Sequence, residues 1–371
     1  MIPYILIFFI SLLLMVLSEK VFKKSKVLKT IFALLSIISI SYFASIRADE
    51  IGTDVLVYVK PFLEYTKIYG IGWLFKYSEC EVLYLLLNHF VAIANGGIQH
   101  LLFVISFFIS FMFYKYAKNF ESETDVCITY AVYLFVFFGI TLNLVRQSIA
   151  TAIVIYSMKY LKKEDFKGYI ISVIIASGFH ISAIIMIPIF FLYKFFGTKK
   201  ELLVKIIVTV ISIITVLCAE YLLKYMYLFS NKFDTEYVNR YMNNSWHFNL
   251  TWEILKLFIF IILMIVLRYK NNTQANKYDK KYFDFCKFLL ILDLVFFQFG
   301  AIFRYAERFS YYFMIISYSY LIPCLLDIFK KKEEKELRIL PTIMIMAILL
   351  IYFYTVFALL KISSIIPYST R

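Results

Sequence analysis

The chain of 371 residues is 62% hydrophobic and only 17% charged, and its mean hydropathy is +0.78. Soluble domains contain about 45–50% apolar and about 25% charged residues, so this composition excludes a soluble globular protein and indicates an integral membrane protein. The formal net charge of +14 does not indicate nucleic-acid binding, because most lysines lie between apolar runs rather than on a basic face interleaved with stacking aromatics.

Apolar runs of about 17–20 residues recur along the chain, and a helix of this length crosses about 30 Å of hydrocarbon. Linkers rich in Gly, Ser or Pro are absent, as are internal repeats. The sequence therefore predicts an all-α, polytopic membrane protein with a single integral membrane domain over 1–371. We expect about twelve spanning helices, at 2–18, 30–46, 98–117, 126–142, 144–161, 168–178, 181–196, 203–219, 252–268, 286–302, 309–328 and 339–361.

The first run has no basic segment before it and no small-residue cleavage site after it, so we expect it to stay as a helix rather than be removed as a signal peptide. The run 168–178 is short for a span, and only Gly178 and its neighbours separate it from the next.

The segments after every second span, beginning with the first, hold most of the 39 basic residues. Basic residues concentrate in cytoplasmic loops, so we expect these segments in the cytoplasm and both termini outside. The run 81–95 would reverse this pattern if it crossed. It is short and ends in Asn95-Gly96-Gly97, which favours a re-entrant or interfacial helix. The alternative is that 81–95 does cross the membrane and that a compensating error elsewhere in the expected spans restores the sides of the later loops.

Two long external segments, about 47–80 and 220–251, are expected to cap a cavity that opens outward. Polar and charged residues gather at the external helix ends, where positive charge is disfavoured. The planar guanidinium binds phosphate bidentately, so arginines there predict a site for a diphosphate head group at the lipid surface. The residues at these external ends are Arg47, Asp49, Glu50, Asp54, Asn143, Arg146, Gln147, His180, Arg304 and Arg308.

Structural explanations stand beside this one. An arginine at a helix end often snorkels or pairs with an acid, and Glu307 lies between Arg304 and Arg308. Arg146 has no acidic residue within several positions on either side, which favours a ligand for it. A lone histidine at a turn, such as His180, is as often a packing residue. The external aromatics could form an interfacial belt or stack on sugars; they include Trp73, Tyr237, Tyr241 and Trp246.

The sequence shows no pattern of a metal or cofactor enzyme. The five cysteines have neither CxxC nor metal-type spacing, and no Walker loop, GxGxxG, HExxH or GxSxG arrangement occurs. Three acids in ADEIGTD are close enough in sequence to suggest a divalent ion only weakly. We therefore expect a metal-independent site without a cofactor.

Four short motifs, in this order, resemble the EpsG/Wzy group of polysaccharide polymerases. RADEIGTDVLVYVKPF is similar to its "R…GTD…Y…F" signature, LNLVRQSIATAIVIYSMKYL to its "N…RQ…A" helix and SGFHISAIIMIPIFFL to its "FH.SA…P" helix. FRYAERFSYYF is similar to the arginine and aromatic element that the group carries late in the chain. Together the motifs cover nearly the full length.

The resemblance implies a transmembrane fold related to the GT-C glycosyltransferases, and an O-antigen, capsule or exopolysaccharide polymerase of the cytoplasmic (inner) membrane. Its site would face outside or the periplasm. Its substrates would be oligosaccharide repeats on a polyisoprenyl diphosphate such as undecaprenyl diphosphate, and the growing glycan would move to the non-reducing end of the next lipid-linked repeat. Membrane lipids, a repeat-unit flippase and a chain-length regulator are the implied partners.

Such a transfer needs a base for the attacking hydroxyl and positive charge beside the departing diphosphate. The motif positions suggest His180 or Asp54 as the base and Arg146, with Arg304 or Arg308, as the donor site. Arg47 could hold the acceptor diphosphate, and Asn143 and Gln147 complete the substrate-binding set.

Two other classes of protein remain as alternatives. A transporter of the same lipid-linked sugars would also use an arginine-lined cavity, but it is expected to show internal repeats and charge in mid-membrane, and the sequence reveals neither. A membrane acyltransferase is expected to carry an intramembrane histidine motif, which His89, His100 and His247 do not form.

Overall fold

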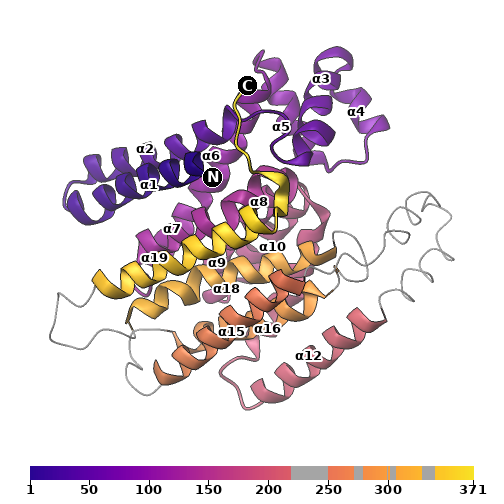
Figure 1. Ribbon diagram of the computed structural model, residues 1–371. Coiled ribbons are helices and arrows are strands. Elements are labelled where there is room, and N and C mark those ends of the chain that lie inside the picture. The colour runs from indigo at the N-terminus through magenta and orange to yellow at the C-terminus, as the bar shows by residue number, and fades with distance from the viewer. Residues whose placement is uncertain (219–249, 271–278, 299, 301–305, 328–338) are drawn as a thin grey trace. The chain divides into compact units, whose positions relative to one another are not determined.

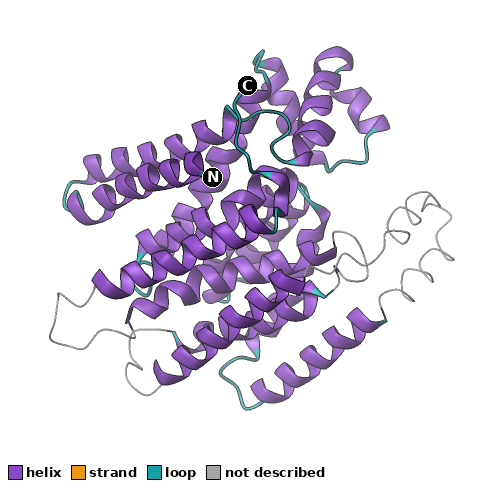
Figure 2. Ribbon diagram, in the orientation of Figure 1, coloured by secondary structure: helices purple, strands orange, loops and turns teal. Residues whose placement is uncertain are grey.

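A computed structural model describes residues 1–218, 250–270, 279–298, 300, 306–327 and 339–371. This part of the chain is helical, and its only β pairing is an isolated antiparallel bridge between Arg47 and Thr370 (Figures 1 and 2). The expected all-α fold class is confirmed. The chain forms two compact units, Met1–Ile187 with Ile322–Arg371 and Pro188–Leu321, and each is described by itself; the single membrane domain stays a prediction.

The first unit is built mainly of long helices joined by short turns. Its elements are α1 (Ile2–Val16) continued by η1 (Leu17–Val21), α2 (Lys26–Ser45), η2 (Val55–Val59), α3 (Lys60–Tyr69), α4 (Ile71–Tyr77), α5 (Val82–Ile93), α6 (Ile98–Asn119), α7 (Val126–Val132) with η3 (Tyr133–Phe137) and α8 (Phe138–Asn143), α9 (Val145–Lys162), α10 (Phe166–Ser177), η4 (Ile181–Met186), η6 (Leu325–Asp327), α19 (Ile339–Phe353), η8 (Tyr354–Leu359) and η9 (Ile362–Ser364).

The second unit contains the remaining described elements. They are α11 (Ile187–Lys194), α12 (Glu201–Leu217), α15 (Leu250–Lys270), α16 (Lys280–Phe297), η5 (Ala306–Phe309) and α18 (Ser310–Cys324), with α11 and α18 at its boundaries.

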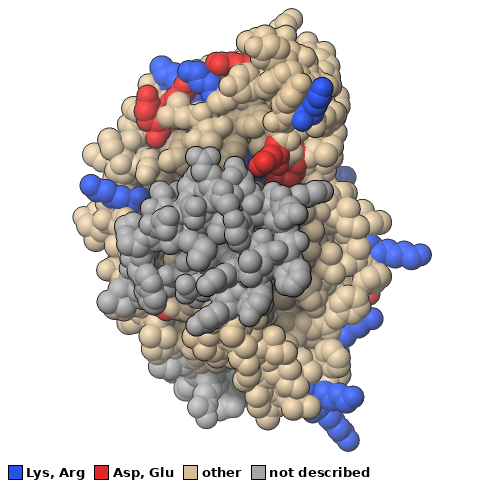
Figure 3. Space-filling model, turned by 90° about the vertical axis from the view of Figure 1, so that its right-hand side faces the viewer, with Lys and Arg blue, Asp and Glu red and all other residues tan. Residues whose placement is uncertain are grey.

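Within the described residues, five helical stretches are long and apolar enough to cross a membrane: Ile2–Val21, Lys26–Ser45, Ile98–Asn119, Val126–Asn143 and Leu340–Leu359. Val126–Asn143 is 94% buried inside the protein, whereas Ile2–Val21 and Leu340–Leu359 are each 33% buried. A helix that is apolar on all sides belongs in the interior, and the exposed apolar faces of the outer helices suit lipid. The surface view agrees, since charged side chains form small groups among broad uncharged areas (Figure 3).

Every predicted apolar run overlaps an observed helix, but the number of crossings and the sides of the termini stay predictions. Two details differ from the sequence analysis. The helix expected from 286 begins at Lys280, because the Asp279 carboxylate caps it by accepting from the Tyr282 amide at 3.3 Å. The external segment 47–80 contains η2, α3 and α4, which were not foreseen. The run 81–95 forms α5, whose 12 residues extend about 18 Å, less than a bilayer core and a length that fits the favoured re-entrant or interfacial helix.

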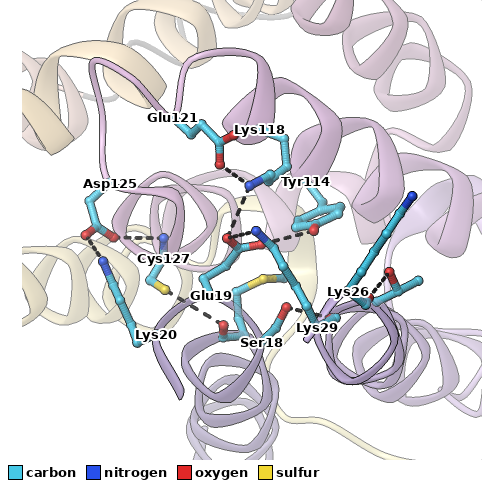
Figure 4. A network of polar contacts seen from close by, with 12 residues as sticks. Ser18, Glu19, Lys20, Lys26, Lys29, Tyr114, Lys118, Glu121, Asp125 and Cys127 are labelled. Carbon is cyan, nitrogen blue, oxygen red and sulfur yellow. Dashed lines mark hydrogen bonds and ion pairs between the residues drawn. The ribbon is translucent and has the colours of Figure 1, made fainter. Parts of the chain in front are cut away.

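A buried acid ties the ends of three helices together (Figure 4). Oε2 of Glu19 lies 3.0 Å from Lys29 Nζ and 3.2 Å from Lys118 Nζ, and Tyr114 donates to Oε1 at 3.1 Å. Lys20 beside it pairs with Asp125 at 2.5 Å. A carboxylate that is 7% exposed is tolerable only because these donors surround it. The network joins the α1–α2 turn to α6 and to the start of α7.

The second unit holds a more deeply buried pair. Lys256 Nζ of α15 lies 2.6 Å from Asp293 Oδ1 of α16 and 3.3 Å from Ser310 Oγ of α18. The exposed fractions of the Lys256 and Asp293 side chains are 0% and 2%. Both residues lie inside predicted spans, whereas the expectation from the sequence concerned charge in mid-membrane and stays a prediction. Each lies within about two turns of a helix end, not in the middle of its helix.

We predict that Lys256→Met destabilises the protein by about 3–5 kcal/mol, because it leaves the Asp293 carboxylate buried without its cation. Thermal unfolding of the purified protein in detergent would measure this loss.

The double variant Lys256→Met with Asp293→Leu should recover most of the loss, since an apolar pair of similar volume replaces the ion pair. Lys280→Met, at an exposed position on α16, is the matched control. A Lys256→Met protein as stable as the control would contradict the prediction.

Candidate functional site

The central feature of the candidate site is a break between α8 and α9. Leu144 has φ −94° and ψ 65°, which is not helical, so the Val145 amide and the Leu142 carbonyl lose their normal helical partners. The loop after α2 supplies replacements. Asp54 Oδ2 accepts from the Val145 amide at 2.9 Å, and Asn143 Oδ1 accepts from the Thr53 amide and hydroxyl, both at 2.8 Å.

Arg47 closes the other side of this break. Its Nη2 donates to the Leu142 carbonyl at 3.1 Å, while Nη1 and Nε donate to the carbonyls of Ala44 and Ile51 at 2.6 and 3.2 Å. Burial lowers the pKa of Arg47 to about 10, so the guanidinium stays charged at neutral pH. It is 2% exposed, and the positions of its donors give it a structural task rather than contact with a ligand.

Gly52 lets the loop approach the break. Its φ is +81°, and a Cβ at this position would collide with the Leu142 carbonyl. The "R…GTD" and "N…RQ" motifs are therefore two halves of one contact: Arg47, Gly52, Thr53 and Asp54 all meet the backbone or side chains of 142–145.

Arg146 follows this contact directly, in the first turn of α9. Its Nη1 donates to Glu81 Oε2 at 2.6 Å, and its guanidinium carbon lies 4.0 Å from the centre of the Tyr58 ring and 5.9 Å from that of Tyr84. The side chain is 14% exposed, and its Nε is buried without a hydrogen-bond partner. A charged nitrogen that is buried without an acceptor is unusual.

Glu81 is the residue that the sequence analysis missed. It stands just before α5, 65 positions from Arg146, so no local pattern connects the two. Its second oxygen accepts from the Ile181 amide at 3.1 Å. Glu81 thus links Arg146 to the turn that carries His180, and the Leu83 amide reinforces the link by donating to the Gly178 carbonyl at 2.9 Å.

His180 is partly buried and begins η4. Its Nδ1 lies 2.7 Å from Ser182 Oγ and 3.4 Å from the Ser182 amide, contacts that fix the plane of the ring. The first unit therefore places Arg47, Asp54, Asn143, Arg146 and His180 around one set of connected turns, with Gln147 buried just inside α9.

The remaining candidates from the sequence are Arg304, Arg308 and four external aromatic residues. Arg308 is partly buried and belongs to the second unit, whereas Arg304 lies outside the described residues, as do Tyr237, Tyr241 and Trp246. Trp73 lies in α4 between the rings of Tyr69 and Tyr77, at 4.9 and 5.1 Å; its stacking on sugars stays a prediction.

Among the described residues, no group of three or more His, Cys, Asp or Glu side chains could hold a metal ion. The acids of ADEIGTD have separate partners instead. Asp54 accepts from the Val145 amide, and Asp49 pairs with Arg371 at 2.5 Å and with Lys60 at 3.3 Å.

The model of the EpsG family matches residues 30–370, which include every candidate residue of this site. The chain belongs to the EpsG family. No curated protein and no solved structure is similar enough to match it. The match confirms the resemblance seen in the motifs and indicates a membrane protein with a polymerase-type role in polysaccharide synthesis. In this EpsG-family chain, three of the four motifs meet at the break between α8 and α9 and at the Arg146–Glu81 pair.

We predict that Gly52→Ala destabilises the protein, because left-handed backbone costs an L-residue about 1–2 kcal/mol and the new methyl group would also push the loop away from Leu142. A lower unfolding temperature in detergent is the expected result.

Gly72→Ala is the matched control, since a Cβ there meets nothing within 4 Å and Gly72 lies inside α4. If the two variants unfold at the same temperature, the tight approach at Gly52 is not required.

Proposed function

We propose that this protein polymerises lipid-linked oligosaccharide repeat units on the outer face of the cytoplasmic membrane. The growing glycan would leave its polyisoprenyl diphosphate and be joined to the non-reducing end of the next lipid-linked repeat. The family match supports a polymerase of this general kind. The observation that carries the finer proposal is Arg146, a guanidinium at the start of a helix with one nitrogen on Glu81 and a buried Nε without a partner.

The reaction needs positive charge where the leaving group develops its own charge. A sugar hydroxyl of the acceptor attacks the anomeric carbon of the donor, the bond from that carbon to the diphosphate oxygen breaks, and the diphosphate departs with the electron pair. Guanidinium donors placed at that oxygen stabilise the transition state. The start of α9 adds the partial positive charge of a helix N-terminus. In this proposal Arg146 binds the donor diphosphate, and Glu81 and Tyr58 hold its side chain in place.

His180 is the proposed general base. Nδ1 accepts from the Ser182 amide at 3.4 Å, and with that bond the neutral ring carries its hydrogen on Nε2. To take the hydroxyl proton on Nε2, the ring must adopt the other tautomer, in which Nδ1–H donates to Ser182 Oγ at 2.7 Å and the amide bond is given up. Asp54 was the other candidate, but its Oδ2 serves the Val145 amide and the residue is 7% exposed. We therefore assign Asp54, Asn143 and Arg47 to positioning the start of α9, in place of direct contact with the substrate.

In this proposal the site faces outward, the donor is a lipid-linked diphosphate, and the transfer needs no metal ion. Gln147, Arg304 and Arg308 remain candidates for substrate contact because they stand in the family-like motifs. The flippase and the chain-length regulator are proposed partners on the same grounds.

We predict that Arg146→Ala lowers polymer formation by about 10²–10³-fold, the effect of removing one donor from a developing anion. Arg146→Lys should recover only part of the rate, because an ammonium keeps the charge but loses the planar fork. The measurement is the rate of ladder formation from polyisoprenyl-diphosphate-linked repeats of the native host, by protein reconstituted in liposomes without nucleotide or added metal.

Lys163→Ala, an exposed position at the other end of α9, is the matched control and should form the ladder at the normal rate. Equal ladders from the Arg146→Ala and control proteins would refute the role of Arg146. If the unchanged protein forms no ladder but moves the lipid-linked repeat across the vesicle membrane, it is a transporter and the polymerase proposal is wrong.

A further inference from the structure

We infer that the segment Ile365–Arg371, which we call the C-terminal strap, is a positioning element of the Arg146 site. The strap leaves η9 and ends beside the last turn of α2, close to the loop that closes the α8–α9 break (Figure 1). The inference that this affects catalysis rests on the proposed function, whereas the effect on the loop itself does not.

Aromatic contacts anchor the first part of the strap. Tyr4 of α1 donates to the Ile365 carbonyl at 2.8 Å, and Tyr368 donates to the Phe43 carbonyl at 2.6 Å. The ring of Tyr368 stacks on Phe43 with centroids 4.1 Å apart and meets Tyr4 edge-on at 5.3 Å. Ile365 is fully buried, and its side chain lies against Gly139 of α8, where a Cβ would have no room.

Backbone pairing holds the last part of the strap on both sides of Arg47. The Ala48 amide donates to the Ser369 carbonyl at 2.9 Å, and the Arg371 amide donates to the Ile46 carbonyl at 3.0 Å. These are the two bonds of the bridge between Arg47 and Thr370. An ion pair of 2.5 Å between Arg371 Nε and Asp49 Oδ1 completes the contact.

The bridge lies in a continuous series of contacts that ends at Arg146. It fixes the backbone of Arg47, whose guanidinium binds the Leu142 carbonyl. The same loop then supplies Thr53 to Asn143 and Asp54 to the Val145 amide, one residue before Arg146. Because the strap touches α8 through Ile365 and the loop through its backbone, it joins α8 to the loop that caps the start of α9.

Surface ion pairs alone contribute little to stability. We therefore expect the ion pair of Arg371 with Asp49 to act mainly by holding the strap in position against the loop. A small misplacement of a binding group can lower a rate by about 10²-fold. We expect Arg371→Gln to lower kcat for polymer formation by about 10-fold to 100-fold, with little change in KM for the lipid-linked repeat. Arg371→Lys, which can still reach Asp49, should recover most of the rate.

Amide hydrogen exchange tests the strap without reference to activity. Removal of residues 368–371, or Arg371→Gln, should increase exchange in peptides that contain Thr53 and Val145, whose amides are bonded across the break. The control is Lys361→Gln, an exposed basic residue outside the strap, which should alter neither exchange nor rate. Peptides from the far end of α9 should exchange normally in every variant.

The strap proposal is overturned if both strap variants leave exchange at Thr53 and Val145 unchanged. It is also overturned if their rates fall only in parallel with a general loss of protection, which would indicate simple destabilisation, or if Arg371→Lys is as slow as Arg371→Gln. Failure of the proposed function would look different: the unchanged protein would form no ladder, while the exchange at these two amides would still respond to the strap.

Discussion

The α8–α9 break is the constraint on which the arrangement of the first unit depends. An interrupted helix in an apolar interior exposes amides and carbonyls that must find partners inside the protein, since lipid provides none. The partners come from a loop almost a hundred residues earlier: Arg47 takes the Leu142 carbonyl and Asp54 the Val145 amide. Buried polar groups have few alternative partners, so these hydrogen bonds hold the conformation of the loop and that of the break together.

This constraint also explains why charged residues are acceptable so close to apolar helices. Arg47 is buried, yet each of its three donor nitrogens bonds a backbone carbonyl, so its charge serves the ends of helices. Arg146 directly follows Val145, whose amide is capped by Asp54, so this cap also fixes the backbone position of Arg146. At the other end of α2, Glu19 forms a network with Lys29 of α2 and Lys118 of α6, so buried charge contributes at both ends of α2.

Much of this fold was predictable because its signal is local. Apolar runs of span length predict helices by composition alone, and each run overlaps a helix among the described residues. Three of the four motifs also contact one another in the structure. What the sequence could not show is pairing over distance: Arg146 seemed to lack an acid, but Glu81 comes from 65 positions away. Arg47 and Asp54 suggested ligands because their residue types suit phosphate and proton transfer, whereas their roles as caps depend on the break at Leu144, a backbone feature that composition does not encode.

The buried Lys256–Asp293 pair and the partly exposed Arg146–Glu81 pair show why residue type alone cannot identify a substrate site. An ionisable residue within membrane helices suggests function by default, and by that rule Lys256 and Arg146 are equal. Lys256 is a point charge, enclosed completely, with Asp293, Ser310 and the ring of Phe297 around its ammonium. Such a group has no room for a ligand and suits the joining of three helices. Arg146 retains a 14% exposed side chain, and its pair with Glu81 occupies only one end of its planar fork. Exposure of the side chain, rather than charge, therefore distinguishes Arg146, the proposed partner of an anionic substrate, from Lys256, which is fully enclosed.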